Sequence, residues 1–506
     1  MRRSIFVVFL IACALHAMAF SSACAQRLVL LHVNDLHGYI VPRIEKALDP
    51  QRPVGGAANL AVMIEAQRAA DPEGVILLAA GDMFHGAPVS DLFQGRPVLD
   101  IMNALRFDAM TLGNHEFDWG PAALRAMTEE ARFPFLSANI GDAAGSPLPW
   151  VKPYVILERK GVKVAVIGMT TPETAFAVKR EYVAGLRFAL PEKLLPGIIS
   201  EVRREGATIV VLLSHFGLAE DMRLASAVHG IDIIVGGHSH TALADPVLSG
   251  QTIVVQAGAR GLYLGVLEIT IDEKTGKLES ATENGELKTV WSGPGDASDG
   301  EIARLVGRYE AKLKPMLDEV VGETRIDLTR RTDGESSLGD VITDSMRAPT
   351  GAQIAIENSG GIRADIPAGR ITMERVYTAL PFDDDLFCMD LTGEALLQIF
   401  EKAAASQRGL LQVSGIEVAY AVGQDGRRKV KGMSVGGVPL DRLKTYRVVT
   451  NDFLAEGGDG LTGFRKGSRR VRATDMRDAF VDYLRRHSPI TGAEGKRITV
   501  SAETAE

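Results

Sequence analysis

The N-terminal half of the chain alternates short apolar runs with stretches of helical periodicity. Five of the runs are rich in β-branched residues and cover residues 28–33, 75–80, 109–112, 209–213 and 231–235. Runs of this length and composition are typical of strands buried on both faces of a sheet. Between them, apolar residues recur at helical spacing over residues 57–70, 121–131 and 192–205. We therefore expect a layered α/β domain, to which we assign residues 26–297.

A turn-rich segment at residues 292–300, with three glycines and a proline, interrupts this pattern. Residues 298–320 then place apolar side chains at helical spacing between charges, which predicts a helix that links two domains. The remaining residues, 321–502, are again of mixed type. Helices are expected there over residues 338–347, 393–405 and 473–486. This organisation predicts a second, smaller α/β domain.

The first 25 residues have the features of a signal peptide. Arg2 and Arg3 form a basic start, an apolar core follows over residues 5–15, and residues 23–25 (Ala-Cys-Ala) give a small-x-small cleavage pattern. We expect a periplasmic or secreted protein. Lipidation at Cys24 is the alternative, which is less favoured because Ser21 stands where an aliphatic residue is preferred.

Length, charge and cysteine content narrow the classes of protein further. A chain of 506 residues, 46% hydrophobic and 24% charged, is too long for one core, so two domains are expected. The net charge of −8 and the lack of a long basic run argue against nucleic acid as a partner. No stretch after the leader reaches the ~18 apolar residues of a membrane span. Without the leader only Cys388 remains, so no intramolecular disulfide forms and a buried apolar role is expected for it.

Each of the five strand-like runs is followed by a short block of metal-ligand residue types. The blocks are residues 34–37 (NDLH), 81–82 (GD), 113–116 (GNHE), 214–215 (SH) and 237–240 (GHSH). The carboxyl ends of strands in an open α/β sheet share one crevice, so these blocks are expected to converge. Two divalent ions about 3.5–4 Å apart need one bridging carboxylate with imidazole, carboxylate or amide ligands around it.

We interpret the blocks as a two-metal site with Asp82 as the bridging carboxylate. The ligands expected for one ion are Asp35, His37 and His240. Those expected for the other are Asn114, His215 and His238. The residue types accept Zn²⁺, Mn²⁺, Co²⁺ or Fe²⁺ and do not decide between them.

His115 and Asp118 are the predicted catalytic pair. His115 adjoins a ligand but is free to protonate a leaving oxygen or to stabilise phosphoryl charge, and Asp118 would fix its tautomer. Glu116 is expected to support its loop. His85 is left open between a contact with substrate or water and a solvated loop position. Four other histidines are expected to be structural or to lie in the leader, namely His16, His32, His229 and His487.

These blocks, in this order and spacing, resemble the calcineurin-type metallophosphoesterase signature of the 5′-nucleotidase family. Residues 358–363 (NSGGIR), 380–382 (LPF) and 451–460 (NDFLAEGGDG) resemble the blocks with which the family's C-terminal domain holds a nucleotide. The resemblance implies a four-layer α/β/β/α metallophosphoesterase sandwich, joined by a helix to a smaller α/β nucleotide-binding domain. It also implies two bound metal ions, an active site between the domains and a hinge rotation during turnover.

The resemblance further implies a set of substrate contacts in the second domain. Phe382 and Phe453 would stack on the base, and stacking tolerates any base because each has a π face. Asp459 would accept hydrogen bonds from ribose hydroxyls. Three more residues are implied to contact substrate, namely Asn358, Gly360 and Arg363. Arg363 would contact the phosphate of the substrate. A second arginine should also contact that phosphate, and Arg331 is preferred over Arg330 for this role.

The function predicted from these residues is an exported, metal-dependent 5′-nucleotidase acting on nucleoside 5′-monophosphates, with longer nucleotides or UDP-sugars as further substrates. The runner-up is a 2′,3′-cyclic-nucleotide phosphodiesterase with 3′-nucleotidase activity, which needs nearly the same residues. A thiosulfohydrolase of the same superfamily is disfavoured, because a small sulfate ester needs no pair of phenylalanines. A non-catalytic nucleotide-binding protein is disfavoured because every expected ligand is present. The sequence does not indicate an oligomeric state.

Overall fold

The computed structural model describes residues 26–178, 182–272, 278–280, 285–293, 300–382, 384–406, 408–424, 426–492 and 496–502. The predicted signal peptide lies outside the described residues. The chain divides into two compact units, residues 1–310 and 311–506. The division falls inside helix α9 (Glu301–Leu317), which lies within the stretch predicted to be a linker helix. The two units are described separately.

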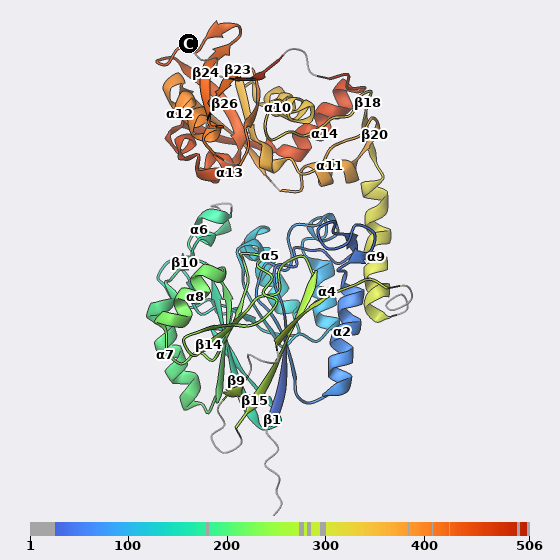
Figure 1. Cartoon of the computed structure of the whole chain (residues 1–506), viewed down its shortest axis with the longest axis vertical. Coiled ribbons are helices and arrows are strands. Elements are labelled where there is room, and N and C mark those ends of the chain that lie inside the picture. The colour runs from blue at the N-terminus through green and yellow to red at the C-terminus, as the bar shows by residue number, and fades with distance from the viewer. Residues whose placement is uncertain are drawn as a thin grey trace, which may run out of the picture. The chain divides into compact units, whose positions relative to one another are not determined.

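Two sheets form the centre of the N-terminal unit (Figure 1). The first is formed by β1 (Gln26–Val33), β4 (Val75–Ala79), β5 (Ala109–Thr111), β6 (Phe135–Leu136), β15 (Tyr263–Ile271), β16 (Leu278–Ser280) and β17 (Gly285–Thr289). Its order is β16-β15-β1-β4-β5-β6, and β17 also pairs with β15. The second is formed by β8 (Tyr154–Arg159), β9 (Val162–Thr170), β11 (Ile209–His215), β12 (Ile233–Gly236), β13 (Val247–Ser249) and β14 (Thr252–Val255), in the order β13-β14-β12-β11-β9-β8.

Helices cover the outer face of each sheet and complete four layers. The helices of this unit are α2 (Ala57–Ala70), α3 (Pro88–Asp91), α4 (Arg96–Ala104), α5 (Gly120–Glu130), α6 (Thr174–Ala177), α7 (Pro191–Arg204) and α8 (Leu218–Ala227). In Figure 1, α7 and α8 lie outside one sheet and α2 and α4 outside the other. Buried residues of both sheets, such as Leu30, Ile76 and Val211, pack in one core between them. The predicted α/β/β/α sandwich is therefore confirmed.

Strand direction places the polar blocks together at one edge of each sheet. β1, β4 and β5 run parallel to one another, as do β9, β11 and β12. The chain leaves β1, β4 and β5 at their carboxyl ends directly into the blocks at 34–37, 81–82 and 113–116. Two short strand pairs complete the unit, β2 (Arg43–Ile44) with β3 (Pro53–Val54) and β7 (Ile140–Gly141) with β10 (Arg187–Phe188).

The C-terminal unit is built on a five-stranded sheet with a core on each face. The sheet contains β19 (Ile354–Asn358), β21 (Asp385–Thr392), β22 (Leu411–Ser414), β26 (Thr445–Asn451) and β27 (Ser468–Asp475), in the order β22-β19-β26-β21-β27. Its helices are α10 (Ser337–Thr350), α11 (Met373–Ala379), α12 (Gly393–Ala404), α13 (Asp452–Ala455) and α14 (Met476–His487). Val449 faces the core that contains α10 and α14, and Val448 faces the core that contains α12, as the alternation of a strand requires. Cys388 is buried in the first core, as expected.

Smaller sheets flank this core. A four-stranded sheet contains β23 (Glu417–Val422), β24 (Arg428–Val435), β25 (Val438–Pro439) and β28 (Ile498–Ala502), in the order β25-β24-β23-β28. A two-stranded sheet pairs β18 (Val320–Thr324) with β20 (Gly369–Thr372). Figure 1 shows α10 and α14 close together, in agreement with their shared core.

The predicted helices agree with the structure to within three residues, and one of the three-residue differences has a local cause. Helix α14 begins at Met476, three residues after the expected 473, because strand β27 continues to Asp475. The Asp475 carboxylate then accepts a hydrogen bond from Asp478 N and caps the helix.

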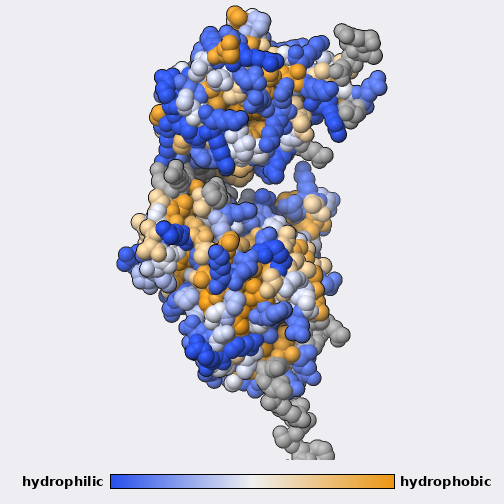
Figure 2. Space-filling model, turned by 90° about the vertical axis from the view of Figure 1, so that its left-hand side faces the viewer, coloured by the Kyte–Doolittle hydropathy of each residue, from blue (hydrophilic) through white to orange (hydrophobic). Residues whose placement is uncertain are grey.

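None of the helices in the described residues is long and apolar enough to cross a membrane. The face of the C-terminal unit in Figure 2 is largely hydrophilic, with apolar residues scattered among polar ones.

Candidate metal centre

The predicted metal ligands adopt an unusual backbone conformation where they follow their strands. Five of the seven lie in the left-handed region, which side chains other than glycine seldom occupy. They are Asp35 (φ 49°), His37 (φ 50°), Asp82 (φ 52°), His238 (φ 72°) and His240 (φ 55°). Backbone strain of this kind costs about 1–3 kcal/mol per residue and is concentrated at functional sites. The strain turns these side chains out of the strand direction and toward one another.

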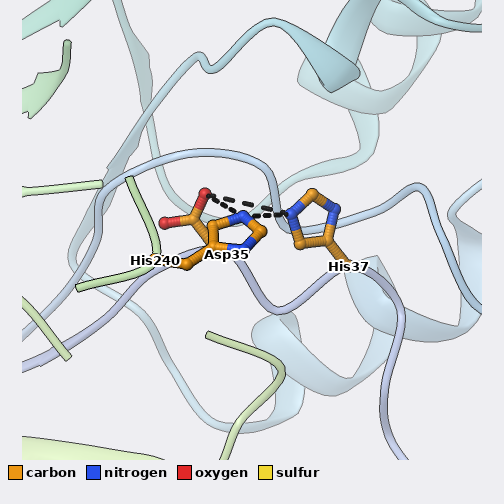
Figure 3. Close-up of side chains that lie close together, drawn as sticks. All are labelled: Asp35, His37 and His240. Atoms are coloured by element: carbon orange, nitrogen blue, oxygen red, sulfur yellow. Dashed lines mark hydrogen bonds and ion pairs between the residues drawn. The ribbon is translucent and has the colours of Figure 1, made fainter. Parts of the chain in front are cut away.

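Asp35, His37 and His240 form the first group (Figure 3). His240 Nε2 lies 3.3 Å and His37 Nε2 lies 3.9 Å from Asp35 Oδ1. The two imidazole Nε2 atoms are 3.0 Å apart. Figure 3 shows the three side chains directed at one point from two separate chain segments. Three donor atoms converging in this way match one shell of the predicted site.

Asp82, His215 and His238 form the second group. His215 Nε2 lies 3.0 Å from Asp82 Oδ2, and Asp82 Oδ1 accepts a hydrogen bond of 2.9 Å from His115 N. Ligand atoms of Asp82 and His37 also lie within 4.8 Å of each other, so Asp82 reaches a residue of the first group. A carboxylate that reaches both groups fits the predicted bridging role.

The polar atoms of this site fit divalent cations. Asn114 Oδ1 is buried and has no hydrogen-bond partner among the described residues, an arrangement that costs about 1–3 kcal/mol unless something binds the oxygen. Gly113 adjoins it, and a Cβ there would overlap the Asp82 carboxylate, so only glycine leaves room for the ligand. The set of imidazole, carboxylate and amide donors is one that Zn²⁺, Mn²⁺, Co²⁺ and Fe²⁺ accept.

Burial and neighbouring charges set the protonation of these groups. Burial lowers the pKa of His37 to about 4, which keeps its imidazole neutral, as a metal ligand must be. For Asp82, burial raises the pKa, but the charges of His215 and His115 outweigh it and hold the pKa well below the usual value. The site therefore contains a carboxylate that stays ionised at neutral pH although it is 2% exposed.

Backbone carbonyl groups orient two of the imidazoles. His37 Nδ1 lies 2.8 Å from His85 O, and His215 Nδ1 lies 2.7 Å from Ala80 O. A carbonyl oxygen only accepts, so each Nδ1 carries a proton and each Nε2 faces the site, where a bound metal would displace any proton that it carries. Both Nε2 atoms are the ones that face the carboxylates.

His115 and Asp118 form a hydrogen-bonded pair at the edge of this centre. His115 Nδ1 lies 2.5 Å from Asp118 Oδ2. Burial lowers the pKa of His115, but the charges of Asp118 and Asp82 outweigh it and raise the pKa to about 10. At neutral pH the imidazole therefore carries a proton on Nε2 as well, as the predicted acid role requires.

Three residues to which the sequence assigned no ligand or catalytic role hold the centre in place. Asn34 Nδ2 donates to Asp35 Oδ2 at 2.7 Å. The Glu116 carboxylate accepts from Gly113 N at 2.6 Å and from Asp82 N at 3.0 Å, so it joins two ligand loops as the sequence predicted for loop support. Gln256 Nε2 donates to Gly237 O at 2.6 Å and supports the block at 237–240. Gln256 directly follows the buried strand β14, and this position is the sequence signal that would have identified it.

The C-terminal unit exposes the two phenylalanines predicted to contact a base. Phe382 is 45% and Phe453 46% exposed, which is unusual for large apolar side chains. Phe453 lies in α13, which Asn451 caps, and its ring packs so closely on Gly458 that no Cβ would fit there. The Phe453 ring therefore rests against the backbone of Gly458.

The polar residues predicted to bind substrate lie on loops of the same unit. Asp459 has a φ of 52°, and Arg408 Nη1 lies 3.0 Å from its Oδ1. Asn358 is buried and its side-chain amide lies 2.9 Å from Asn451 Nδ2, while the exposed Arg363 donates to Gly360 O at 3.1 Å. Arg330 and Arg331 are both exposed, and Arg331 pairs with Asp333 at 3.1 Å. The choice of Arg331 stays a prediction.

Comparison with known proteins identifies the family. A family model described as calcineurin-like phosphoesterase matches residues 28–242, and one described as the C-terminal domain of 5′-nucleotidase matches residues 317–466. The snake venom 5′-nucleotidase of Naja atra is 33% identical, over 94% of this chain and 99% of its own. The 5′-nucleotidase of Homo sapiens is 31% identical, over 88% of this chain and 86% of its own.

A solved structure agrees with both matches. The crystal structure of a 5′-nucleotidase precursor from Thermus thermophilus is 34% identical and covers 94% of this chain and 99% of its own, with a TM-score of 0.74. The family models account for both units, and the relatives match nearly end to end. The chain therefore belongs to the 5′-nucleotidase family and is a phosphohydrolase of the calcineurin-like metallophosphoesterase type.

Proposed function

We propose that this protein is an exported 5′-nucleotidase that removes phosphate from nucleoside 5′-monophosphates. The observation that carries this proposal is the convergence of Asp35, His37 and His240 with Asp82, His215 and His238 at the strand ends of one unit. The exposed Phe382 and Phe453 of the other unit support a nucleoside as the leaving group. Export rests on the signal-peptide pattern of residues 1–25.

The chain's own residues have distinct parts in this reaction. The seven predicted ligands would hold two divalent ions, which when bound supply Lewis-acid stabilisation of the phosphoryl oxygens and activate a water molecule. His115 Nδ1 is hydrogen-bonded to Asp118, so His115 Nε2 is the atom that would donate a proton to the leaving 5′ oxygen. Residues 321–502 would bind the nucleoside, with Asp459 accepting from ribose and Arg363 and Arg331 contacting phosphate.

Metal dependence and substrate class are tested together on one purified sample. Protein stripped with a chelator is expected to lose phosphate release from adenosine 5′-monophosphate and to regain it with Mn²⁺ or Co²⁺. Adenosine 2′,3′-cyclic monophosphate and adenosine 3′-monophosphate are expected to be turned over at least about tenfold more slowly, since a tenfold ratio needs only about 1.4 kcal/mol of differential binding. Faster hydrolysis of the cyclic substrate would contradict the proposed class and favour the phosphodiesterase.

Truncation of Phe453 tests the contact with the base. Phe453→Ala is expected to raise KM for adenosine 5′-monophosphate by roughly 5- to 150-fold, because base stacking on an aromatic ring contributes about 1–3 kcal/mol. Phe453→Tyr keeps the ring and is the matched control. Ribose 5-phosphate has no base, so its KM should not change in either variant. An equal rise in KM for both substrates would show that Phe453 supports its loop and does not contact a base.

A further inference from the structure

His85 is a buried histidine beside the metal centre to which the proposed mechanism gives no role. It lies in the loop between β4 and α3 and is 5% exposed. Its ring stacks on that of His115, with centroids 5.5 Å apart and planes 14° apart, and it meets Trp119 edge-on at 5.6 Å. The solvated loop position that the sequence left open for His85 is therefore wrong.

The His85 side chain contacts the same carboxylate oxygen as His115. His85 Nδ1 lies 3.1 Å from Asp118 Oδ2, the atom that lies 2.5 Å from His115 Nδ1. An ionised carboxylate oxygen has two lone pairs and accepts from both rings at once. On its far side, His85 Nε2 lies 4.0 Å from Asp91 Oδ1, which is itself held by Gly86 N at 2.8 Å. The His85 ring is thus held by its hydrogen bond to Asp118 and by its packing on His115 and Trp119, with Asp91 near its Nε2 atom.

The Asp118 carboxylate would be less constrained without His85. Asp118 is partly exposed, at 16% of its side chain, and the two imidazoles of His85 and His115 both hold its Oδ2 atom. Hydrogen bonds to the outer partner of a functional histidine are known to fix its ring orientation and tautomer. His85 also stacks on the His115 ring, so its hydrogen bond to Asp118 and its ring packing have to be tested separately.

We propose that His85 is a positioning residue that, through Asp118, holds the His115 imidazole in the orientation and tautomer needed to donate from Nε2. The inference rests on the proposed function of His115 as proton donor. It assigns His85 no contact with substrate or metal. The effect of His85 therefore depends on Asp118.

Three substitutions separate the hydrogen bond of His85 from its ring packing. His85→Phe keeps a stacked ring without a donor, His85→Gln keeps a donor without the ring, and His229→Gln is the matched control at an exposed site. His85→Phe is expected to lower kcat on adenosine 5′-monophosphate about tenfold, and His85→Gln by less than about threefold, as for other outer partners of functional histidines. KM and the metal content should stay at the wild-type values.

A double-mutant cycle with Asp118→Asn tests whether His85 acts through Asp118. In that background His85→Phe should change kcat by less than about twofold, because the shared acceptor is already altered. A full tenfold loss in the Asp118→Asn background would overturn the proposal, as would a loss of metal in His85→Phe or a His85→Gln variant as slow as His85→Phe.

Nuclear magnetic resonance gives a measurement that does not depend on hydrolysis. In long-range ¹H–¹⁵N spectra of chains labelled with ¹⁵N-histidine, the His115 ring signals should shift in His85→Phe and stay in place in His229→Gln. Unchanged His115 signals in His85→Phe would overturn the positioning role. If the His115 signals differ between the wild type and His85→Phe but the wild-type protein releases no phosphate from any nucleotide, the proposed function is wrong. The contact between the two histidines is then still supported.

Discussion

Replacing Asp82 by asparagine is expected to lower kcat on adenosine 5′-monophosphate by about 10³-fold or more. Asp82 belongs to two of the converging ligand groups and contacts His215 Nε2 at 3.0 Å. The lost charge would weaken the hold on both predicted ions, and metal stabilisation of a phosphoryl transition state contributes several kcal/mol, of which each 1.36 kcal/mol is about tenfold in rate. Kinetics and metal analysis by mass spectrometry on the same sample measure both effects.

The matched control for Asp82→Asn is Asp142→Asn, which makes the same chemical change at an exposed turn. It should leave kcat and metal content at the wild-type values. Far-ultraviolet circular dichroism of Asp82→Asn should match the wild type, because the side chain keeps its size. A folded Asp82→Asn variant with full activity and full metal content would exclude Asp82 as a shared ligand.

The sequence predicted where the candidate ligands lie because the signal is local. Apolar runs such as residues 75–80 are long enough to read as buried strands, and β4 occupies Val75–Ala79. The polar residues that follow, Gly81 and Asp82, then lie at a carboxyl end by direct continuation of the chain. Parallel pairing of β1, β4 and β5 then brings the polar blocks together, since it places three such carboxyl ends side by side.

Interactions between distant residues were not predictable in the same way. The left-handed backbone conformation at Asp35 and His238 could not be predicted from the residue types, because neither aspartate nor histidine requires it. Whether His85 points to Asp118 or to solvent depends on how the loops at 82–88 and 115–119 pack. The preference for Arg331 over Arg330 depends on a loop in which Arg331 pairs with Asp333, a contact that spacing alone does not indicate.

Substitution of His115 by alanine should lower kcat by about 10²–10⁴-fold, the usual contribution of a positioned general acid. His115 is not among the seven predicted ligands, so metal content should not change. KM for adenosine 5′-monophosphate should stay within about threefold of the wild-type value, since the substitution removes no contact that holds the nucleoside. His487→Ala, at an exposed histidine of helix α14, is the control. Loss of metal together with activity would identify His115 as a ligand.

The choice of leaving group decides between the two roles open to His115. A 5′ alkoxide is a poor leaving group and needs a proton, whereas 4-nitrophenolate leaves without one. If His115 donates the proton, as its pKa of about 10 and its bond to Asp118 favour, His115→Ala should slow 4-nitrophenyl phosphate by less than about tenfold while nucleotide hydrolysis falls by the full 10²–10⁴-fold. If His115 instead stabilises phosphoryl charge, both substrates lose the same factor, because that charge is common to them. Equal losses would therefore reject the proton-donor role and leave His115 as an electrostatic contact.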